Sequence, residues 1–429
     1  MSALSKEALR RGWCPGTLKP METGDGWLVR LHPPGAKLTS AQLRRIAALA
    51  AEHGNGLIEI SARANLQIRG VTAESHPMLV ERLLAERLVD EHDGDGPQRV
   101  TLASPLTGGD PSSLIDTVAL AAQIELRART IPGLPAKLCV IVDDGGAQAL
   151  DGFSGDIRLV GTGAGRLALC LADQFWHGPI PETGAAAAVE AILRGFTALR
   201  HAAPERIRRL RDLPPEALSG LTILPETATP TPRPPPQRAG LFAQGEDHFA
   251  ALIGLPFGRC DAATLDQLGA GLGRSEADIR LSPWRGLAFR DLSHAEVGKL
   301  LALASDLALI TRDDDPRLSV QACAGSPACS RAEAPTMADA AALATAAADL
   351  LAHGVTLHVS GCVKACAHPA AADLTLVGRD GRYDIVLGGT TRDKPVATLD
   401  LSALLTRLQP GQDIHARLVK ATRSTGSRG

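Results

Sequence analysis

The sequence predicts an α+β protein built from two duplicated halves. Two kinds of segment recur in the same order and at nearly the same spacing. The pairs are LIEISARANLQIRGV (57–71) with ADIRLSPWRGLAFRDL (277–292), and DIRLVGTGAGRLALCL (156–171) with DLTLVGRDGRYDIVL (373–387). One such match would arise by chance, whereas two at one spacing indicate a repeated unit. We expect the halves to pack about an approximate two-fold axis, with a large cavity between them.

The length and composition of the chain agree with a multidomain globular protein. The chain has 429 residues, which is more than a single hydrophobic core usually organises. Its 45% hydrophobic and 21% charged residues are typical of globular proteins. The net charge of −2 and the 3% aromatic content disfavour a nucleic-acid-binding protein, which needs a basic surface or stacking platforms.

The sequence also suggests where the protein works. The longest Ala/Leu-rich stretch, 333–352, is interrupted by Asp339 and Asp349, so it does not read as a membrane span. The N-terminal MSALSKEALRRGW is charged and lacks the apolar core of a secretory signal. We therefore expect a cytoplasmic protein, in which cysteines stay reduced, bind metal or take part in catalysis.

The first half is expected to begin with a small α+β unit. Its predicted order is strand, helix, strand, strand, helix, at residues 27–32, 39–53, 57–61, 64–70 and near 76–87. Thr39 is the candidate N-cap of the first helix.

A second, α/β unit should follow in the same half. It has a helix near 111–128 with Asp110 or Ser112 as candidate cap, and strands at 137–142 and 156–171. A helix near 184–200 closes this half, and the second half repeats the order, with a helix near 334–352.

A proline-rich stretch separates the halves. LPETATPTPRPPPQR (224–238) is too dense in proline for a helix or a central strand, so we interpret it as part of an extended linker. The expected domains are 1–75, 76–203, the linker 204–238, 239–305, and 306–429.

Four of the eight cysteines cluster in the second half. QACAGSPACS (321–330) and SGCVKACAHP (360–369) contain Cys323, Cys329, Cys362 and Cys366. Glycine, serine and proline between the first two allow the loop to wrap, and the second two would share a face at a helix start, where the dipole favours thiolate. Structural zinc prefers closer cysteine pairs, and a disulfide or inert thiols remain alternatives. We favour an iron–sulfur cluster with four cysteine ligands.

A row of hydrogen-bond donors is expected on one strand of the first half. Period-two alternation in SARANLQIRG would put four polar side chains on one face: Arg63, Asn65, Gln67 and Arg69. This row is either a solvated sheet face or a binding surface for carboxylates and carbonyls. The matching second-half strand is less polar, with Trp284, Gly286, Ala288 and Arg290. Only one half therefore keeps the full row of donors, as expected if the duplicated halves bind an asymmetric ligand.

The cysteine pattern C-x5-C followed by C-x3-C resembles the cluster signature of the siroheme-type nitrite and sulfite reductase superfamily. Flanking segments resemble the branch of that superfamily that acts on precorrins in aerobic cobalamin biosynthesis. These segments are RRGWCPGTLKPMETGDGWLVRL (10–31), HGNGLIEISARANLQIRG (53–70), SPLTGGDP (104–111) and LPAKLCVIVDDGG (134–146). The resemblance implies that each half combines a ferredoxin-like half-domain with an α/β domain, of which only the second binds the cluster.

The resemblance also implies ligands and an activity. It assigns a 4Fe-4S cluster to the four cysteines, and a precorrin pocket to Arg63, Asn65, Gln67, Arg69 and Lys137. It implies an iron–sulfur monooxygenase that converts precorrin-3A to precorrin-3B by hydroxylating carbon 20 and closing a γ-lactone. The reaction uses O2 and NADH-derived electrons from a separate reductase, and a non-haem iron is compatible with it.

One position departs from the reductase pattern. Sulfite and nitrite reductases of the superfamily tend to carry a second lysine where this chain has Cys139, which favours the precorrin branch. The alternative is a sirohaem-dependent nitrite or sulfite reductase, in which Cys366 would bridge the cluster and the haem iron.

The remaining conspicuous residues have simpler interpretations. Cys170 and Cys260 are expected to be small buried hydrophobes, and Cys14 either that or an extra ligand. His358 and His368 flank the cysteine segment and are more often structural than ligands. GTGAGR (161–166) is a hairpin turn, because a strand follows it where the dinucleotide motif needs a helix.

Overall fold

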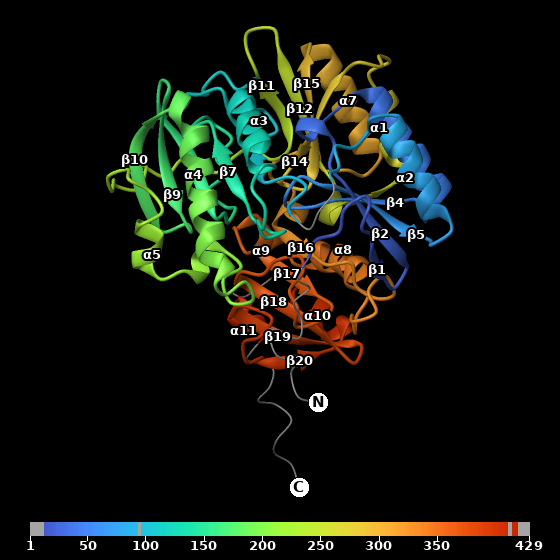
Figure 1. The fold of residues 1–429 in the computed structure, drawn as a ribbon. Coiled ribbons are helices and arrows are strands. Elements are labelled where there is room, and N and C mark those ends of the chain that lie inside the picture. The colour runs from blue at the N-terminus through green and yellow to red at the C-terminus, as the bar shows by residue number, and fades with distance from the viewer. Residues whose placement is uncertain (1–12, 93–95, 411–413, 419–429) are drawn as a thin grey trace.

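The protein was analysed as a computed structural model, which describes residues 13–92, 96–410 and 414–418. The outer ends of the first and last expected domains, 1–12 and 419–429, lie outside the described residues. Three lobes are visible in Figure 1: one α/β domain in green, the other in red, and the two ferredoxin-like units together in blue and yellow. Each of the four sheets has five strands.

The first ferredoxin-like sheet has the order β1-β2-β5-β4-β13. Its strands are β1 (Met21–Thr23), β2 (Gly26–Leu31), β5 (Leu66–Val71), β4 (Leu57–Ile60) and β13 (Arg259–Asp261). It is accompanied by the helices α1 (Ser40–His53) and α2 (Ser75–Ala85). The predicted cap of α1 is confirmed, because the Thr39 hydroxyl accepts from Gln42 N at 3.2 Å and Gln42 Oε1 accepts from Thr39 N at 2.9 Å.

The second ferredoxin-like sheet has the matching order β11-β12-β15-β14-β3. Its strands are β11 (Gly240–Ala243), β12 (Phe249–Gly254), β15 (Gly286–Leu292), β14 (Asp278–Ser282) and β3 (Lys37–Leu38). Its helices are α6 (Ala262–Ala270) and α7 (His294–Asp306).

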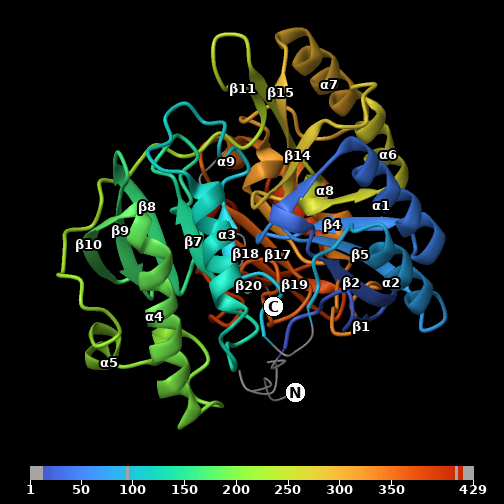
Figure 2. The same cartoon turned by 45° about the horizontal axis from the view of Figure 1, so that its top comes forward.

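The two halves exchange edge strands. β3 comes from the first half but pairs with β14, and β13 comes from the second half but pairs with β4. Helices α1 and α6 also pack against each other. Consequently one hydrophobic core runs through both units and includes Ile46 and Ile68 as well as Leu265 and Phe289. This reciprocity is the structural expression of the pseudo-two-fold relation between the halves. Figure 2 shows α1 and α6, one from each half, side by side.

The two α/β domains have the same strand order, β10-β9-β8-β7-β6 and β16-β17-β18-β19-β20. The first contains β6 (Thr101–Ala103), α3 (Thr117–Ala128), β7 (Val140–Asp143), β8 (Ile157–Gly163), β9 (Arg166–Leu171), β10 (Phe175–Pro181) and α4 (Glu182–His201). The second contains β16 (Val320–Ala322), α8 (Thr336–Ala346), α9 (Ala348–Ala352), β17 (Leu357–Ser360), β18 (Ala372–Arg379), β19 (Arg382–Gly389), β20 (Ala397–Leu399), α10 (Leu401–Arg407) and α11 (Ile414–Leu418). In both, two parallel strand pairs lead into an antiparallel hairpin.

The predicted start of α3 is wrong. The helix begins at Thr117, and its cap is Asp116, whose carboxylate accepts from the backbone N–H groups of Val118 and Ala119. The expected cap Asp110 is engaged elsewhere, because its carboxylate accepts from Ser112 and from Ala147 N. Asp110 therefore stabilises a loop and does not cap the helix.

Short elements complete the chain. They are the 3-10 helices η1 (Pro34–Ala36), η2 (Leu210–Asp212), η3 (Pro256–Gly258) and η4 (Pro316–Ser319), and the helix α5 (Pro215–Ser219). η2 and α5 place Leu210 and Leu218 in the core of the first α/β domain. Within the part of the chain that the structure describes, no helix combines the length and apolarity needed to cross a membrane.

Candidate functional site

The cysteine loops begin at one edge of the second α/β sheet. Strands β16 and β17 are parallel, with Ala322 opposite Val359, so their carboxyl ends reach the same edge. Cys323 directly follows β16, and Cys362 comes two residues after β17. The backbone N–H of Gly361 donates to Cys323 Sγ at 3.1 Å, which joins the two loops.

The first loop then wraps back and brings Cys329 to the same place. The N–H of Cys329 donates to the carbonyl of Gly325 at 2.7 Å. Gly325 has φ +67, and a Cβ there would lie 2.4 Å from Thr336 Oγ1, so a glycine is required. The Thr336 hydroxyl donates to the Cys323 carbonyl at 2.7 Å and holds the start of the loop.

The thiols influence one another electrostatically. Burial raises the pKa of Cys362, and the thiols of Cys323 and Cys329 raise it further. Desolvation raises the pKa of Cys366 to about 11, again with contributions from the other three thiols, although the residue as a whole is exposed. The thiols affect one another because the loops place them near each other, and none of the four is in a disulfide.

The part of the chain that the structure describes contains no preformed site for a single metal ion at the cysteine loops. Among the described residues, no three His, Cys, Asp or Glu side chains converge closely enough to hold one ion. Thiolates around an iron–sulfur cluster are spaced more widely than those around one zinc ion. The expected helix start at Cys362 is wrong, because this segment forms turns and Ala365 has φ +57. The second pair of thiols is therefore positioned by a loop.

The corresponding edge in the first half has no such thiols. The pairing of β6 with β7, Ala103 opposite Val142, matches that of β16 with β17. Ser104 therefore stands where the second half has Cys323, and Gly145 where it has Cys362. Arg233 from the linker fills this edge, donating to both carboxylate oxygens of the fully buried Asp143 at 2.8 and 2.6 Å.

The predicted donor row is only partly a strand face. β5 begins at Leu66, so Arg63 and Asn65 lie in the preceding turn, where Ala64 has φ +50. Arg63 Nη1 donates to the carbonyls of Lys137 and Leu138 at 3.2 and 3.4 Å. The expectation of a single period-two face is therefore wrong for these two residues.

Gln67 and Arg69 do lie on β5, and protein groups surround both. Gln67 Oε1 accepts from Arg30 at 2.9 and 3.1 Å, and its amide donates to Glu59 at 3.0 Å. Arg69 is 2% exposed and pairs with Asp25 and Glu59. The side chain of Lys137, in contrast, is exposed.

Two arginines that sequence reasoning missed complete this region. Desolvation lowers the pKa of Arg30, as does the nearby charge of Arg63. Desolvation also lowers the pKa of Arg99, and Arg30 contributes to the shift. Arg99 Nη2 donates to Ala64 O at 2.6 Å and to Asn65 Oδ1 at 2.7 Å, whereas its buried Nη1 has no partner among the described residues.

Arg30, Arg63 and Arg99 therefore form a cluster of like charges, which we call the arginine cluster. Their hydrogen-bond acceptors are carbonyl and amide oxygens of the protein, together with the Cys14 sulfur beside Arg30. Such a cluster is costly unless an anion neutralises it, so it is suited to bind carboxylates. One of these arginines could have been noticed in the sequence, because Arg30 is the single cation in the otherwise apolar strand GWLVRL of β2.

The histidine expected to be structural has an unusual environment. His358 on β17 is fully buried, and both of its ring nitrogens lack a hydrogen-bond partner. Burial lowers its pKa to about 4, with contributions from His368 and Arg285. Its ring contacts that of His368 edge to face, with centroids 5.6 Å apart.

Two of the isolated cysteines are buried as expected, whereas Cys14 is half-buried. Cys170 and Cys260 are buried, and burial raises the pKa of each to about 12. The GTGAGR segment is the predicted hairpin turn, between β8 and β9.

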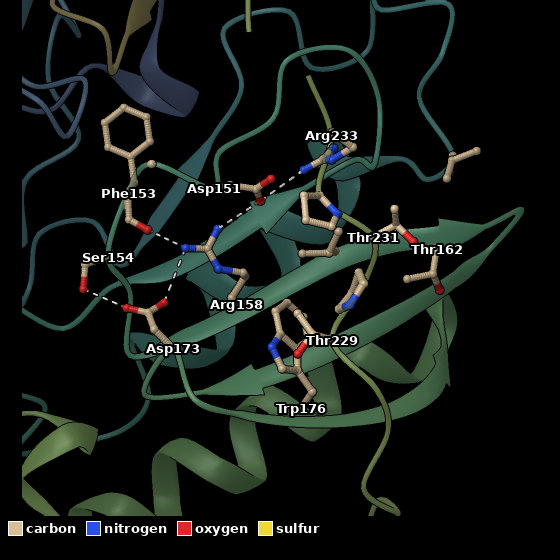
Figure 3. Close-up of a pocket in the computed structure, with 16 residues that line it drawn as sticks. Asp151, Phe153, Ser154, Arg158, Thr162, Asp173, Trp176, Thr229, Thr231 and Arg233 are labelled. Carbon is tan, nitrogen blue, oxygen red and sulfur yellow. Dashed lines mark hydrogen bonds and ion pairs between the residues drawn. The ribbon is translucent and has the colours of Figure 1, made fainter. Parts of the chain in front are cut away.

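A separate cavity of about 830 Å³ lies in the first α/β domain, between its sheet and the linker (Figure 3). Trp176, Arg158 and linker residues 229–233 line it. Arg158 donates to the carbonyls of Leu150 and Phe153, so its charge is already accommodated within the protein. Among the described residues, this cavity shares no lining residue with the arginine cluster or the cysteine loops. Arg233, which lines it, lies at the cysteine-free edge of the first half.

The comparisons with known proteins agree with this architecture. The family described as nitrite/sulfite reductase ferredoxin-like half domain matches residues 19–86. The structure of the Mycobacterium tuberculosis NirA protein superposes with a TM-score of 0.70, covering 94% of this chain and 82% of that one at 23% identity. A ferredoxin–nitrite reductase from Synechococcus elongatus is 27% identical over 89% of this chain and 83% of its own length.

The fold is thus that of the nitrite/sulfite reductase superfamily, and its relative from Synechococcus elongatus is an oxidoreductase. A precorrin-3B synthase from Sinorhizobium sp is 33% identical over 98% of this chain and 91% of its own length. The chain belongs to the precorrin-3B synthase family.

Proposed function

We propose that this protein is an iron–sulfur monooxygenase that converts precorrin-3A to precorrin-3B in the cytoplasm. The observation that supports the proposal most directly is the 33% identity to a precorrin-3B synthase along almost the whole chain. The reaction would combine precorrin-3A, O2 and NADH-derived electrons from a separate reductase. One oxygen atom would enter the product and the other would leave as water.

The four cysteines would hold a 4Fe-4S cluster, which supplies electrons one at a time when bound. Three observations support cluster binding by these cysteines. Their two loops lie at one sheet edge, the Gly361 N–H donates to Cys323 Sγ, and all four thiols are free. Binding of the cluster would convert the four thiols into thiolates, because metal ions displace the proton. A non-haem iron beside the cluster is a further part of this proposal.

The arginine cluster would bind the acetate and propionate groups of the macrocycle. Arg63 and Arg99 meet at the turn before β5, and Arg30 is held on β2 by Gln67. Asn65 and Lys137 lie beside them and would complete the pocket. Guanidinium groups fixed before the ligand arrives bind planar carboxylates at little entropic cost. They would hold the macrocycle in one orientation.

The test is anaerobic reconstitution with iron and sulfide, addition of precorrin-3A, and admission of isotopically labelled O2. We expect one labelled oxygen atom in the product. An unlabelled product, or no turnover by a protein with an intact cluster and donor, would reject the monooxygenase.

A sirohaem-dependent nitrite or sulfite reductase is the second candidate, favoured by the similarity to a ferredoxin–nitrite reductase over most of both chains. Cys366 would then bridge the cluster and the haem iron. A visible spectrum of the purified protein separates the two: sirohaem bands favour the reductase, and cluster absorbance without them favours the monooxygenase.

A further inference from the structure

Arg69 joins the first ferredoxin-like unit to the cysteine loop of the other half. Its Nε and Nη2 donate to the two carboxylate oxygens of Asp25 at 2.9 and 2.6 Å. Nη2 also donates to the carbonyl of Ala328 at 2.9 Å, and Nη1 lies 3.5 Å from Glu59 Oε2. Each of its three nitrogens therefore already has a protein partner, which leaves little capacity for a ligand.

The turn between β1 and β2 lies directly against the same loop. The N–H of Gly24 donates to the Ala328 carbonyl at 3.1 Å. A Cβ at Gly24 would lie 2.3 Å from the carbonyl oxygen of Pro327, so the two backbones touch. The Ala328 carbonyl thus accepts from two donors of the first half.

These contacts fix one peptide plane from both sides. The carbonyl of Ala328 is held by Arg69 and Gly24, and the N–H of the next residue, Cys329, is held by the Gly325 carbonyl at 2.7 Å. A peptide group is rigid, so anchoring both its oxygen and its N–H determines the direction in which Cys329 leaves the backbone.

The second half contains a counterpart without a cysteine loop. Arg290 on β15 donates from Nη1 to the carbonyl of Thr107 at 2.8 Å, in the loop after β6. Its Nε lacks a partner, and its nearest carboxylate, on Asp278, is 3.9 Å away. Burial lowers the pKa of Arg290, whereas that of Arg69 is raised because its two carboxylates outweigh the burial. The fully paired arginine is the one at the cysteine loop.

We propose that Arg69 and Asp25 form an interdomain clamp that positions Cys329 for cluster binding. The inference rests on the proposed cluster at the four cysteines. It makes Arg69 a positioning residue acting through the Ala328 carbonyl, instead of a residue that contacts the substrate.

Amide hydrogen exchange of the metal-free, full-length protein tests the clamp without any cofactor. In Arg69→Gln, the Cys329 amide should exchange about tenfold faster, the effect of losing roughly one charge-assisted hydrogen bond. In the matched control Arg290→Gln, the Cys329 amide should be unchanged, and the amide of Gly109, which donates to Leu106 O, should exchange faster instead. If Arg69→Gln does not fold, Asp25→Asn replaces it in the same measurement. This variant keeps the arginine but removes the carboxylate that orients it, so the Cys329 amide should again exchange faster.

Cluster chemistry provides the second readout. After reconstitution with ferrous iron and sulfide, Arg69→Gln should release iron to a chelator about tenfold faster than the wild type, with a changed paramagnetic resonance spectrum of the reduced cluster. In Arg69→Lys the iron should be released more slowly than in Arg69→Gln but faster than in the wild type, because a lysine keeps the charge but not the forked geometry. Arg290→Gln should match the wild type.

Two results would overturn the clamp: Cys329 exchange that is the same in wild type and Arg69→Gln, or equal cluster release by Arg69→Gln and Arg290→Gln. If the wild type takes up no cluster, the proposed cofactor is wrong, and the exchange experiment alone decides whether the clamp exists.

Discussion

Single arginines are the most informative residues of this protein, because their surroundings differ so sharply. Arg69, Arg209 and Arg233 have carboxylate partners that outweigh their burial and raise the pKa of each. Arg30 and Arg99 have a lowered pKa, because desolvation is not compensated by a paired carboxylate. Under the proposed function, Arg30 and Arg99, which also lie in the arginine cluster, would be neutralised by an anionic ligand.

The first prediction concerns Arg99. Arg99→Gln should weaken precorrin binding about tenfold to hundredfold, since a hydrogen bond to a charged group contributes roughly 1.5–3 kcal/mol. The measurement is a titration followed by the absorbance of the macrocycle. The control is Arg45→Gln, which removes a surface ion pair with Glu86 and should leave binding unchanged. Equal affinity of Arg99→Gln and wild type would contradict the assignment.

The second prediction concerns Asp278 and pH. Burial alone would raise the pKa of this carboxyl, but Arg280, Arg290 and Lys37 outweigh it and hold the pKa below its usual value. A carboxyl with a lowered folded pKa stabilises the protein above its unfolded value of about 3.9, and this stabilisation is lost as the pH falls further.

Asp278→Asn should therefore lower the stability at pH 7 by about 1 kcal/mol or less, since solvent screens part of the interaction. The difference from wild type should shrink as the pH falls below about 4 and vanish only once the carboxyl of the folded protein is protonated. Urea unfolding at several pH values is the measurement, and a difference that grows on acidification would show that the assigned charge partners are wrong.

At the scale of elements, loops rather than helices and strands position the candidate site. The row SARANLQIRG alternates as a strand should, yet its first polar residues form a turn because Ala64 adopts a positive φ. The helix expected at Cys362 is replaced by turns in the same way. Alternation and spacing predict regular elements well, but a positive φ at an alanine depends on contacts made outside the segment.

The third prediction compares two glycines with the same backbone conformation. Gly325 has φ +67 and no room for a Cβ, whereas Gly273 has φ +66 with no atom within 4 Å of that position. Either substitution to alanine should lower the free energy of unfolding by about 1 kcal/mol, because alanine disfavours the left-handed backbone conformation. Only Gly325→Ala must also displace Thr336, so it alone should abolish cluster uptake, measured as iron and sulfide bound per chain. Uptake by Gly325→Ala equal to that by Gly273→Ala would contradict the loop geometry.

At the scale of the whole molecule, the exchange of β3 and β13 makes the halves interdependent. Each ferredoxin-like sheet takes its edge strand from the other half, and the buried cluster of Ile46, Ile68, Leu265 and Phe289 is shared. Separating the halves would expose this apolar core and leave strand edges unpaired.

The fourth prediction follows from this sharing. Residues 1–238 and 239–429 expressed separately should lack cooperative thermal unfolding, and should form a folded complex when expressed together. Calorimetry and co-purification measure these outcomes. A cooperative transition of either half alone would show that the exchanged strands are dispensable.

The sequence by itself determined the duplication, the order of most helices and strands, the hairpins and the four clustered cysteines. These features depend on local periodicity, turn residues and repeats, which are written along the chain. Only the tertiary structure decided that β3 and β13 change sheets, that Arg30 and Arg99 join Arg63, and that Arg69 serves the cysteine loop. Each of these depends on side chains brought together from distant segments, where burial and charge, not spacing, set the energy.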